Sequence, residues 1–112
     1  MNIKAEKIIG MPAVVSARSR IVIDKCLRKL LNIRVNGTVR MERHENILRI
    51  VPVGESESLV VKEISNGRFN LPADWAKENK VQVGNYVYLL ATTNGIYIFP
   101  KTVEFNLVEV SN

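Results

Sequence analysis

The sequence predicts a mainly β protein with two short helices, in which two tandem copies of one unit form a β-barrel as an intrachain pseudo-dimer. Three observations predict this fold class. Apolar and polar residues alternate in short stretches between turn signals, which is typical of strands. Helical spacing of apolar residues is confined to two short segments, and the order of elements repeats after 48 residues. Because a unit of about 45 residues cannot bury a sufficient core alone, the two copies are expected to pack together.

The first copy covers residues 1–53 and alternates between turns and short regular elements. Asp24 is a favourable helix N-cap, and Leu27, Leu30 and Leu31 follow it at helical spacing. In chain order we expect a turn at 10–12, strands at 13–16 and 20–23 around a polar loop at 17–19, a helix after residue 24, and a hairpin with strands at 38–42 and 47–53 joined by a turn at 43–46.

An acidic linker at 54–58 precedes the second copy at 59–102. Gly67 favours a tight turn, and Pro72 has no N–H to lose at the first position of a helix. Residues 103–110 alternate between apolar and polar side chains, and residues 103–112 are expected to form a C-terminal strand or tail. The other expected elements are strands at 59–64 and 68–71, a helix at 72–80, and a hairpin with strands at 86–91 and 96–99.

Residues 20–52 align with residues 68–100 at a constant offset of 48 residues, and the alignment needs no gap. Apolar positions also correspond, for example Leu27 with Trp75 and Ile23 with Leu71. The identities fall on predicted turns, strand ends and helices, which favours an internal duplication. Seven pairs are identical: Arg20/Arg68, Lys29/Lys77, Val35/Val83, Val39/Val87, Asn46/Asn94, Ile50/Ile98 and Pro52/Pro100.

Positive charge is concentrated in the first copy. Residues 1–53 hold 11 Lys and Arg against four acids, a net charge of +7, whereas residues 54–112 hold five against seven, a net charge of −2. Such asymmetry indicates a polyanionic partner for the basic half, although a solvated basic surface would have the same composition.

Several classes of function have no supporting residues. With one cysteine, Cys26, and one histidine, His44, the chain offers no intrachain disulfide and no Cys/His metal site, and we expect His44 to be an exposed loop residue and Cys26 a packed side chain. No catalytic set or phosphate-binding loop is found, so we expect a non-enzymatic protein without a cofactor. The chain has no apolar run of about 20 residues and no signal peptide, which predicts a cytoplasmic location.

The second copy resembles a known family. Residues 61–76, which include the Gly67–Arg68 turn and Leu71–Pro72 before the helix, are similar to the core of the AbrB/SpoVT swapped-hairpin proteins, as are residues 81–85 and the hairpin ending at Pro100. Residues 14–52 match more weakly. Most members carry one copy and form interlocked dimers, so the resemblance implies a tandem swapped-hairpin barrel, as in the MraZ-type arrangement.

The resemblance also implies candidate DNA contacts. Members use the arginine of the glycine–arginine turn and basic residues early in the helix, which correspond here to Arg68 and Lys77 in the second copy. The first copy departs from the motif, with Ser19 in place of glycine and Asp24 in place of proline. Its basic residues are nevertheless at the matching positions, and two neighbours extend the patch. The candidate DNA-binding residues are therefore Arg18, Arg20, Lys25, Arg28, Lys29, Arg68 and Lys77.

Each candidate has a structural alternative. For the first-copy set the alternative to the favoured DNA-binding patch is a solvated helix face with a basic loop, and Arg68 can equally form an ion pair with Glu63 or Asp74. Trp75 is expected in the core rather than as a stacking platform, because its counterpart is Leu27.

These observations lead to two hypotheses. The first is a DNA-binding transcription regulator that contacts double-stranded DNA mainly through the first copy. The alternative is a protein-interaction module, such as the antitoxin of a toxin–antitoxin pair. The second hairpin also carries apolar residues on both faces, among them Tyr86, Tyr88, Leu90, Tyr97 and Phe99, so we expect a homodimer or higher oligomer through this surface unless residues 103–110 cover it.

Overall fold

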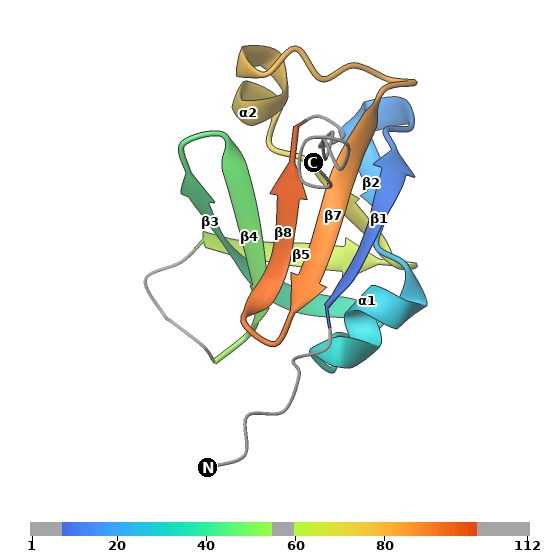
Figure 1. Cartoon of the computed structure of the whole chain (residues 1–112), viewed down its shortest axis with the longest axis vertical. Helices are drawn as coiled ribbons and strands as arrows, with labels where there is room; N and C mark the ends of the chain where they lie inside the picture. The colour runs from blue at the N-terminus through green and yellow to red at the C-terminus, as the bar shows by residue number, and fades with distance from the viewer. Residues whose placement is uncertain (1–7, 55–59, 101–112) are drawn as a thin grey trace, which may run out of the picture.

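Two short helices flank an eight-stranded, antiparallel and nearly closed barrel-like sheet (Figure 1). The structure, a computed structural model, describes residues 8–54 and 60–100. Helix α1 lies near one end of the barrel and α2 near the other (Figure 1). The predicted fold class, mainly β with two short helices, is confirmed.

The elements occur in the same order in both copies. The first copy contains β1 (Ile9–Val14), the 3₁₀ turn η1 (Ala17–Ser19), β2 (Arg20–Val22), α1 (Lys25–Leu30), β3 (Gly37–His44) and β4 (Ile47–Pro52). The second copy contains β5 (Val60–Ser65), β6 (Arg68–Asn70), α2 (Ala73–Glu78), β7 (Tyr86–Thr92) and β8 (Gly95–Phe99).

The sheet exchanges strands between the copies. Its order is β1-β7-β8-β4-β3-β5-β6-β2, so the first strand of each copy pairs with the hairpin of the other: β1 with β7, and β5 with β3. The two remaining cross-copy pairs, β4–β8 and β2–β6, join equivalent strands. The hairpins are therefore swapped within one chain.

The strand register places a pseudo-two-fold axis between the copies. Ile21 pairs with Phe69 and Arg49 pairs with Tyr97, and each pair is separated by the 48-residue offset found in the sequence. The copies differ in the turn that precedes β2 and β6. In the first copy Ser16 pairs with Arg20, which leaves three residues in the turn, and in the second copy Ser65 pairs with Arg68, which leaves two. The first-copy turn is thus one residue longer.

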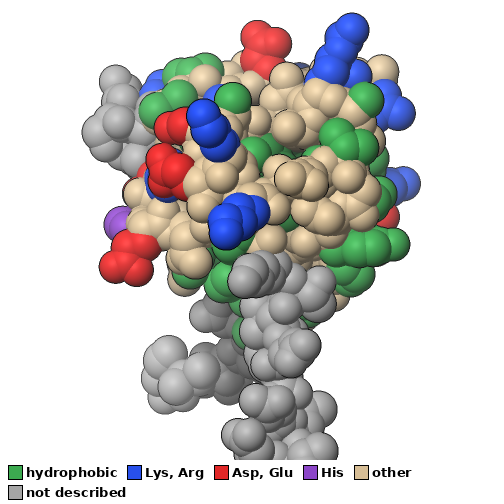
Figure 2. Space-filling view, turned by 90° about the horizontal axis from the view of Figure 1, so that it is seen from above, with side chains coloured by type: hydrophobic (Ala, Val, Ile, Leu, Met, Phe, Trp, Pro, Cys, Tyr) green, Lys and Arg blue, Asp and Glu red, His purple; other side chains and the backbone are tan. Residues whose placement is uncertain are grey.

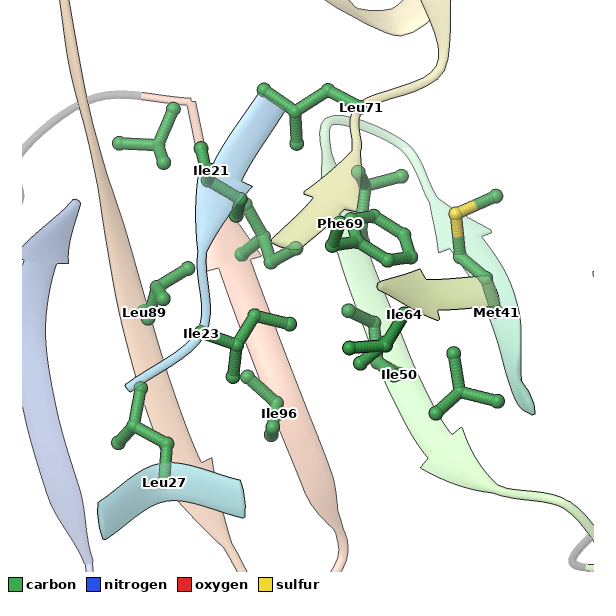
Figure 3. Close-up of a cluster of buried hydrophobic side chains, with 14 of the residues drawn as sticks. Ile21, Ile23, Leu27, Met41, Ile50, Ile64, Phe69, Leu71, Leu89 and Ile96 are labelled. Atoms are coloured by element: carbon green, nitrogen blue, oxygen red, sulfur yellow. The ribbon is translucent and has the colours of Figure 1, made fainter. Parts of the chain in front are cut away.

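The core lies inside the barrel around this axis. Ile21 and Phe69 are 1% and 0% exposed, and they lie within a cluster of aliphatic side chains from both copies (Figure 3). Trp75 is fully buried, as predicted, and its Nε1 donates a hydrogen bond to the carbonyl oxygen of Asn46, 3.1 Å away. Because both copies contribute to one cluster, neither has a core of its own.

The helix ends follow from local sequence. Asp24 caps α1 as predicted, because its Oδ2 accepts a hydrogen bond of 2.9 Å from the backbone N–H of Cys26. The helix α2 begins directly after Pro72, with Asp74 in its first turn. Beyond the helices the chain reverses at Asn32 and Lys80, which have φ of 57° and 56° and are again 48 residues apart.

Three predictions about the first copy are wrong. The expected turn at 10–12 lies within β1, where Pro12 opposes Tyr88; a proline is tolerated there because β1 is an edge strand. The turn at 43–46 is shorter, since β3 extends to His44. Cys26 is exposed rather than packed. The expected C-terminal strand at 103–112 and most of the 54–58 linker lie outside the described residues.

The turns before β2 and β6 share a left-handed backbone. Asn66 and Gly67 have φ of 52° and 74°, and the equivalent Arg18 and Ser19 have φ of 65° and 55°. A non-glycine residue in this region costs about 1 kcal/mol or more, and asparagine tolerates it best, so the first-copy turn is the more strained of the two because it has Ser19 where the second-copy turn has Gly67.

Exchanging the residue types at this turn should move stability in opposite directions. Gly67→Ala is expected to lower the free energy of unfolding by about 1 kcal/mol, and Ser19→Gly to raise it by a similar or smaller amount. No atom outside the neighbouring residues lies closer than 3.8 Å to a Cβ built at Gly67, so the cost is conformational rather than steric. Urea unfolding monitored by Trp75 fluorescence measures both. A loss of stability in Ser19→Gly would contradict the strain.

Candidate nucleic-acid interface

The outer surface of the β2–β6 pair carries two arginines related by the pseudo-two-fold axis. Ile21 and Phe69 point into the core, so the residues on either side of them point outward. Arg20 lies opposite Asn70, and Arg68 lies opposite Val22. Both arginines line an open groove of about 490 Å³, together with Val61, Lys62, Glu63, Ser65 and Asn70.

The charge of these arginines is not neutralised within the described part of the chain. Arg68 is exposed and forms no ion pair there, so the suggested pairing with Glu63 or Asp74 is wrong. Arg20 is half-buried, and its Nε is buried without a hydrogen-bond partner among the described residues. Glu63 is the acid in the groove, and it pairs with neither arginine. The groove therefore retains unused donors for an anion.

The strand swap places α1 beside the turn of the second copy. The backbone N–H of Ile23 donates a 2.8 Å hydrogen bond to the carbonyl oxygen of Gly67, and the Gly67 N–H donates one of 2.8 Å to the carbonyl oxygen of Val35. A Cβ built at Gly67 would lie 3.8 Å from Nε of Arg28. We call the turn at 66–68 together with α1 the Gly67 module.

The reciprocal arrangement forms a second unit. The backbone N–H of Leu71, just before α2, donates a 2.8 Å hydrogen bond to the carbonyl oxygen of Ser19. The Gly84 N–H, after α2, donates one of 2.8 Å to the carbonyl oxygen of Val15. We call the turn at 18–20 together with α2 the Ser19 module.

This crossing separates residues that the sequence placed in one patch. Lys25, Arg28 and Lys29 of α1 join Arg68 in the Gly67 module, whereas Arg18 and Arg20 join Lys77 in the Ser19 module. Arg18, Lys25, Lys29 and Lys77 are exposed. Arg28 is half-buried, and its Nε donates a 2.9 Å hydrogen bond to the carbonyl oxygen of Ile23. The sequence groups these residues by copy, because residues of one copy are close along the chain. The hydrogen bonds between the copies instead bring the helix of each copy next to the turn of the other.

Two other arginines are paired with acids, Arg43 at the end of the barrel that holds α2 and Arg49 within the sheet. Arg43 pairs with Glu78 and lies 3.7 Å from Asp74, while Nη1 of Arg49 lies 2.9 Å from Oε2 of Glu42. Figure 2 views the molecule from the end that holds α2, and acidic and basic side chains lie close to one another there. These arginines stabilise the hairpin and helix and are poor candidates for an external anion.

No other chemical site is found among residues 8–54 and 60–100. The Nε2 of His44 lies 3.2 Å from Oε2 of Glu42. The His44 side chain is 74% exposed, as predicted, but the residue ends strand β3 and does not lie in a loop. This part of the chain contains no group of three His, Cys, Asp or Glu side chains able to hold a metal ion. It also contains no helix long and apolar enough to cross a membrane.

Comparison with known proteins adds no relative: no protein-family model matches the chain, and no curated protein matches it. The resemblance of the second copy to the swapped-hairpin family therefore stays a prediction. The pairing of strands in the barrel is independent of it.

Arg28 and Lys29 should differ in their structural weight. Arg28→Ala removes the hydrogen bond to Ile23 and the side chain that packs beside Gly67, so we expect the free energy of unfolding to fall by about 1 kcal/mol. Lys29→Ala, which removes an exposed side chain, should change it by less than about 0.5 kcal/mol. Thermal or urea unfolding of both variants measures the difference. Equal effects would show that Arg28 is not held as described.

Proposed function

We propose that the protein is a DNA-binding transcription regulator that contacts duplex DNA through the outer surface of β2 and β6 and the two modules beside it. One observation carries the proposal: Arg20 and Arg68 are related by the pseudo-two-fold axis and share an open groove in which neither has an acidic partner among the described residues. Guanidinium groups bind phosphate oxygens and guanine edges in forked geometry.

Symmetry and charge support duplex DNA as the partner. A two-fold arrangement of basic side chains matches the two-fold symmetry of the DNA backbones, as in dimeric DNA-binding proteins. The chain has a formal net charge of +5. Since Arg43 and Arg49 are engaged by acids elsewhere, the basic residues left without ion pairs in the described ranges include those of the two modules.

The alternative, a protein-interaction module such as an antitoxin, gains no support from the described residues. In the resembling family, antitoxins bind toxins through a C-terminal tail, and the residues after Pro100 lie outside the described range. Tyr86 is 56% exposed on the outer face of β7 and is available to a second chain. Association of two chains through that face stays a prediction.

A salt titration tests the proposal. A fluorescently labelled duplex of random sequence, titrated with the protein at several salt concentrations, should show binding that weakens steeply with salt, because bound cations are released from the phosphates. The double variant Arg20→Ala/Arg68→Ala should lower the slope of log K against log salt by about 1.8. Binding is read by anisotropy.

Arg49→Ala is the matched control, because it also removes an arginine, but one that is paired with Glu42 of β3 and lies in neither module. It should leave the salt slope unchanged. Circular dichroism verifies that each variant is folded. The absence of binding at low salt, or an equal loss in the control and the double variant, would contradict the proposal.

A further inference from the structure

The two modules of the candidate interface are related by the fold but not by their side chains. At equivalent positions, α1 carries Lys25, Arg28 and Lys29, whereas α2 carries Ala73, Ala76 and Lys77. The Gly67 module therefore has three basic helix residues where the Ser19 module has one. The axis relates their backbones through the register of β2 and β6.

Acidic residues increase this difference. Asp74 and Glu78 lie on α2, where they face Arg43. The helix α1 contains no acid, and Asp24 before it is occupied in capping the Cys26 N–H. Arg43 offsets one of these two negative charges, so α2 presents Lys77 beside a group with a net charge of −1. A phosphate near α1 would meet basic side chains and no acid of that helix.

The turns differ in the hydrogen bonds they can offer. Arg18 and Asn66 occupy equivalent positions with left-handed backbone, at φ of 65° and 52°, and both side chains are exposed. An arginine presents forked donors that suit guanine, while an asparagine presents a donor and an acceptor that suit adenine. Because the two modules carry different hydrogen-bonding side chains at equivalent positions, we expect them to prefer different bases.

We propose, on the basis of the function proposed above, that the two modules bind different DNA half-sites, and that the chain binds a non-palindromic duplex in one orientation. The Gly67 module makes the stronger contacts with phosphate. A symmetric homodimer presents the same residues twice and so selects palindromic half-sites. A single chain that supplies two different modules does not require the two DNA half-sites to have the same sequence.

The unique cysteine gives a direct test of orientation. Cys26 is exposed on α1, and its equivalent on α2 is Asp74, which is also exposed. An iron chelate attached to Cys26 cleaves DNA close to the Gly67 module. The matched protein, Cys26→Ser with Asp74→Cys, carries the same reagent close to the Ser19 module. The probe is a labelled duplex obtained by selecting tightly bound sequences from random DNA.

A fixed orientation should give cleavage on one flank of the selected site from Cys26 and on the opposite flank from the Asp74→Cys protein. Cleavage of both flanks by each reagent, in equal amounts, would overturn the proposal while leaving DNA binding intact. Failure to recover any bound sequence from the selection would instead refute the proposed function itself, and the inference with it.

Affinity measurements on the same duplex test the unequal contribution. Lys25→Ala/Lys29→Ala should lower the salt slope by about 1.8, and Lys77→Ala by about 0.9 or less. Ala73→Lys, which places a lysine at the α2 equivalent of Lys25, should raise it. A larger loss from Lys77→Ala than from the double variant would overturn the stronger role of the Gly67 module.

Discussion

The pairing of each copy's first strand with the hairpin of the other copy is the interaction on which the rest of the structure depends. A unit of about 45 residues cannot bury enough apolar surface by itself, and the swap lets both units cover a single core. Ile21 and Phe69 meet at its centre because β2 and β6 pair across the pseudo-two-fold axis. The same pairing leaves alternate side chains of these strands outside, where Arg20 and Arg68 share a groove.

The swap also decides which residues form the candidate site. Backbone hydrogen bonds at Gly67 and Ser19 hold each turn against the segment that leads into the other copy's helix. Basic residues close together in sequence, such as Arg20 and Arg28, are thereby assigned to different modules. Ion pairs complete the division, since Arg43 and Arg49 are held by acids of α2 and β3. Arg43 and Arg49 are thus engaged within the chain, although the composition counts them with the other basic residues.

Local features of the structure could be predicted from the sequence, and features that depend on distant pairing could not. The cap at Asp24, the burial of Trp75 and the 48-residue offset follow from short-range chemistry and repetition, and all are observed. The local sequence predicts a turn at Pro12, whereas its position in an edge strand depends on β7, far along the chain. The partner of Asp74 was likewise missed, because Arg43 reaches it only when the β3–β4 hairpin lies beside α2.

The exchange of strands has a consequence for how the chain folds. Ile9 at the start of β1 pairs with Ala91 near the end of β7, and contacts between such distant residues slow folding because a long loop must close first. During synthesis the first copy leaves the ribosome before its pairing strands exist. The barrel can therefore close only after the second hairpin has been made, and until then the exposed edges of β1 and β3 have no native partner from the second copy and are open to pairing with other chains.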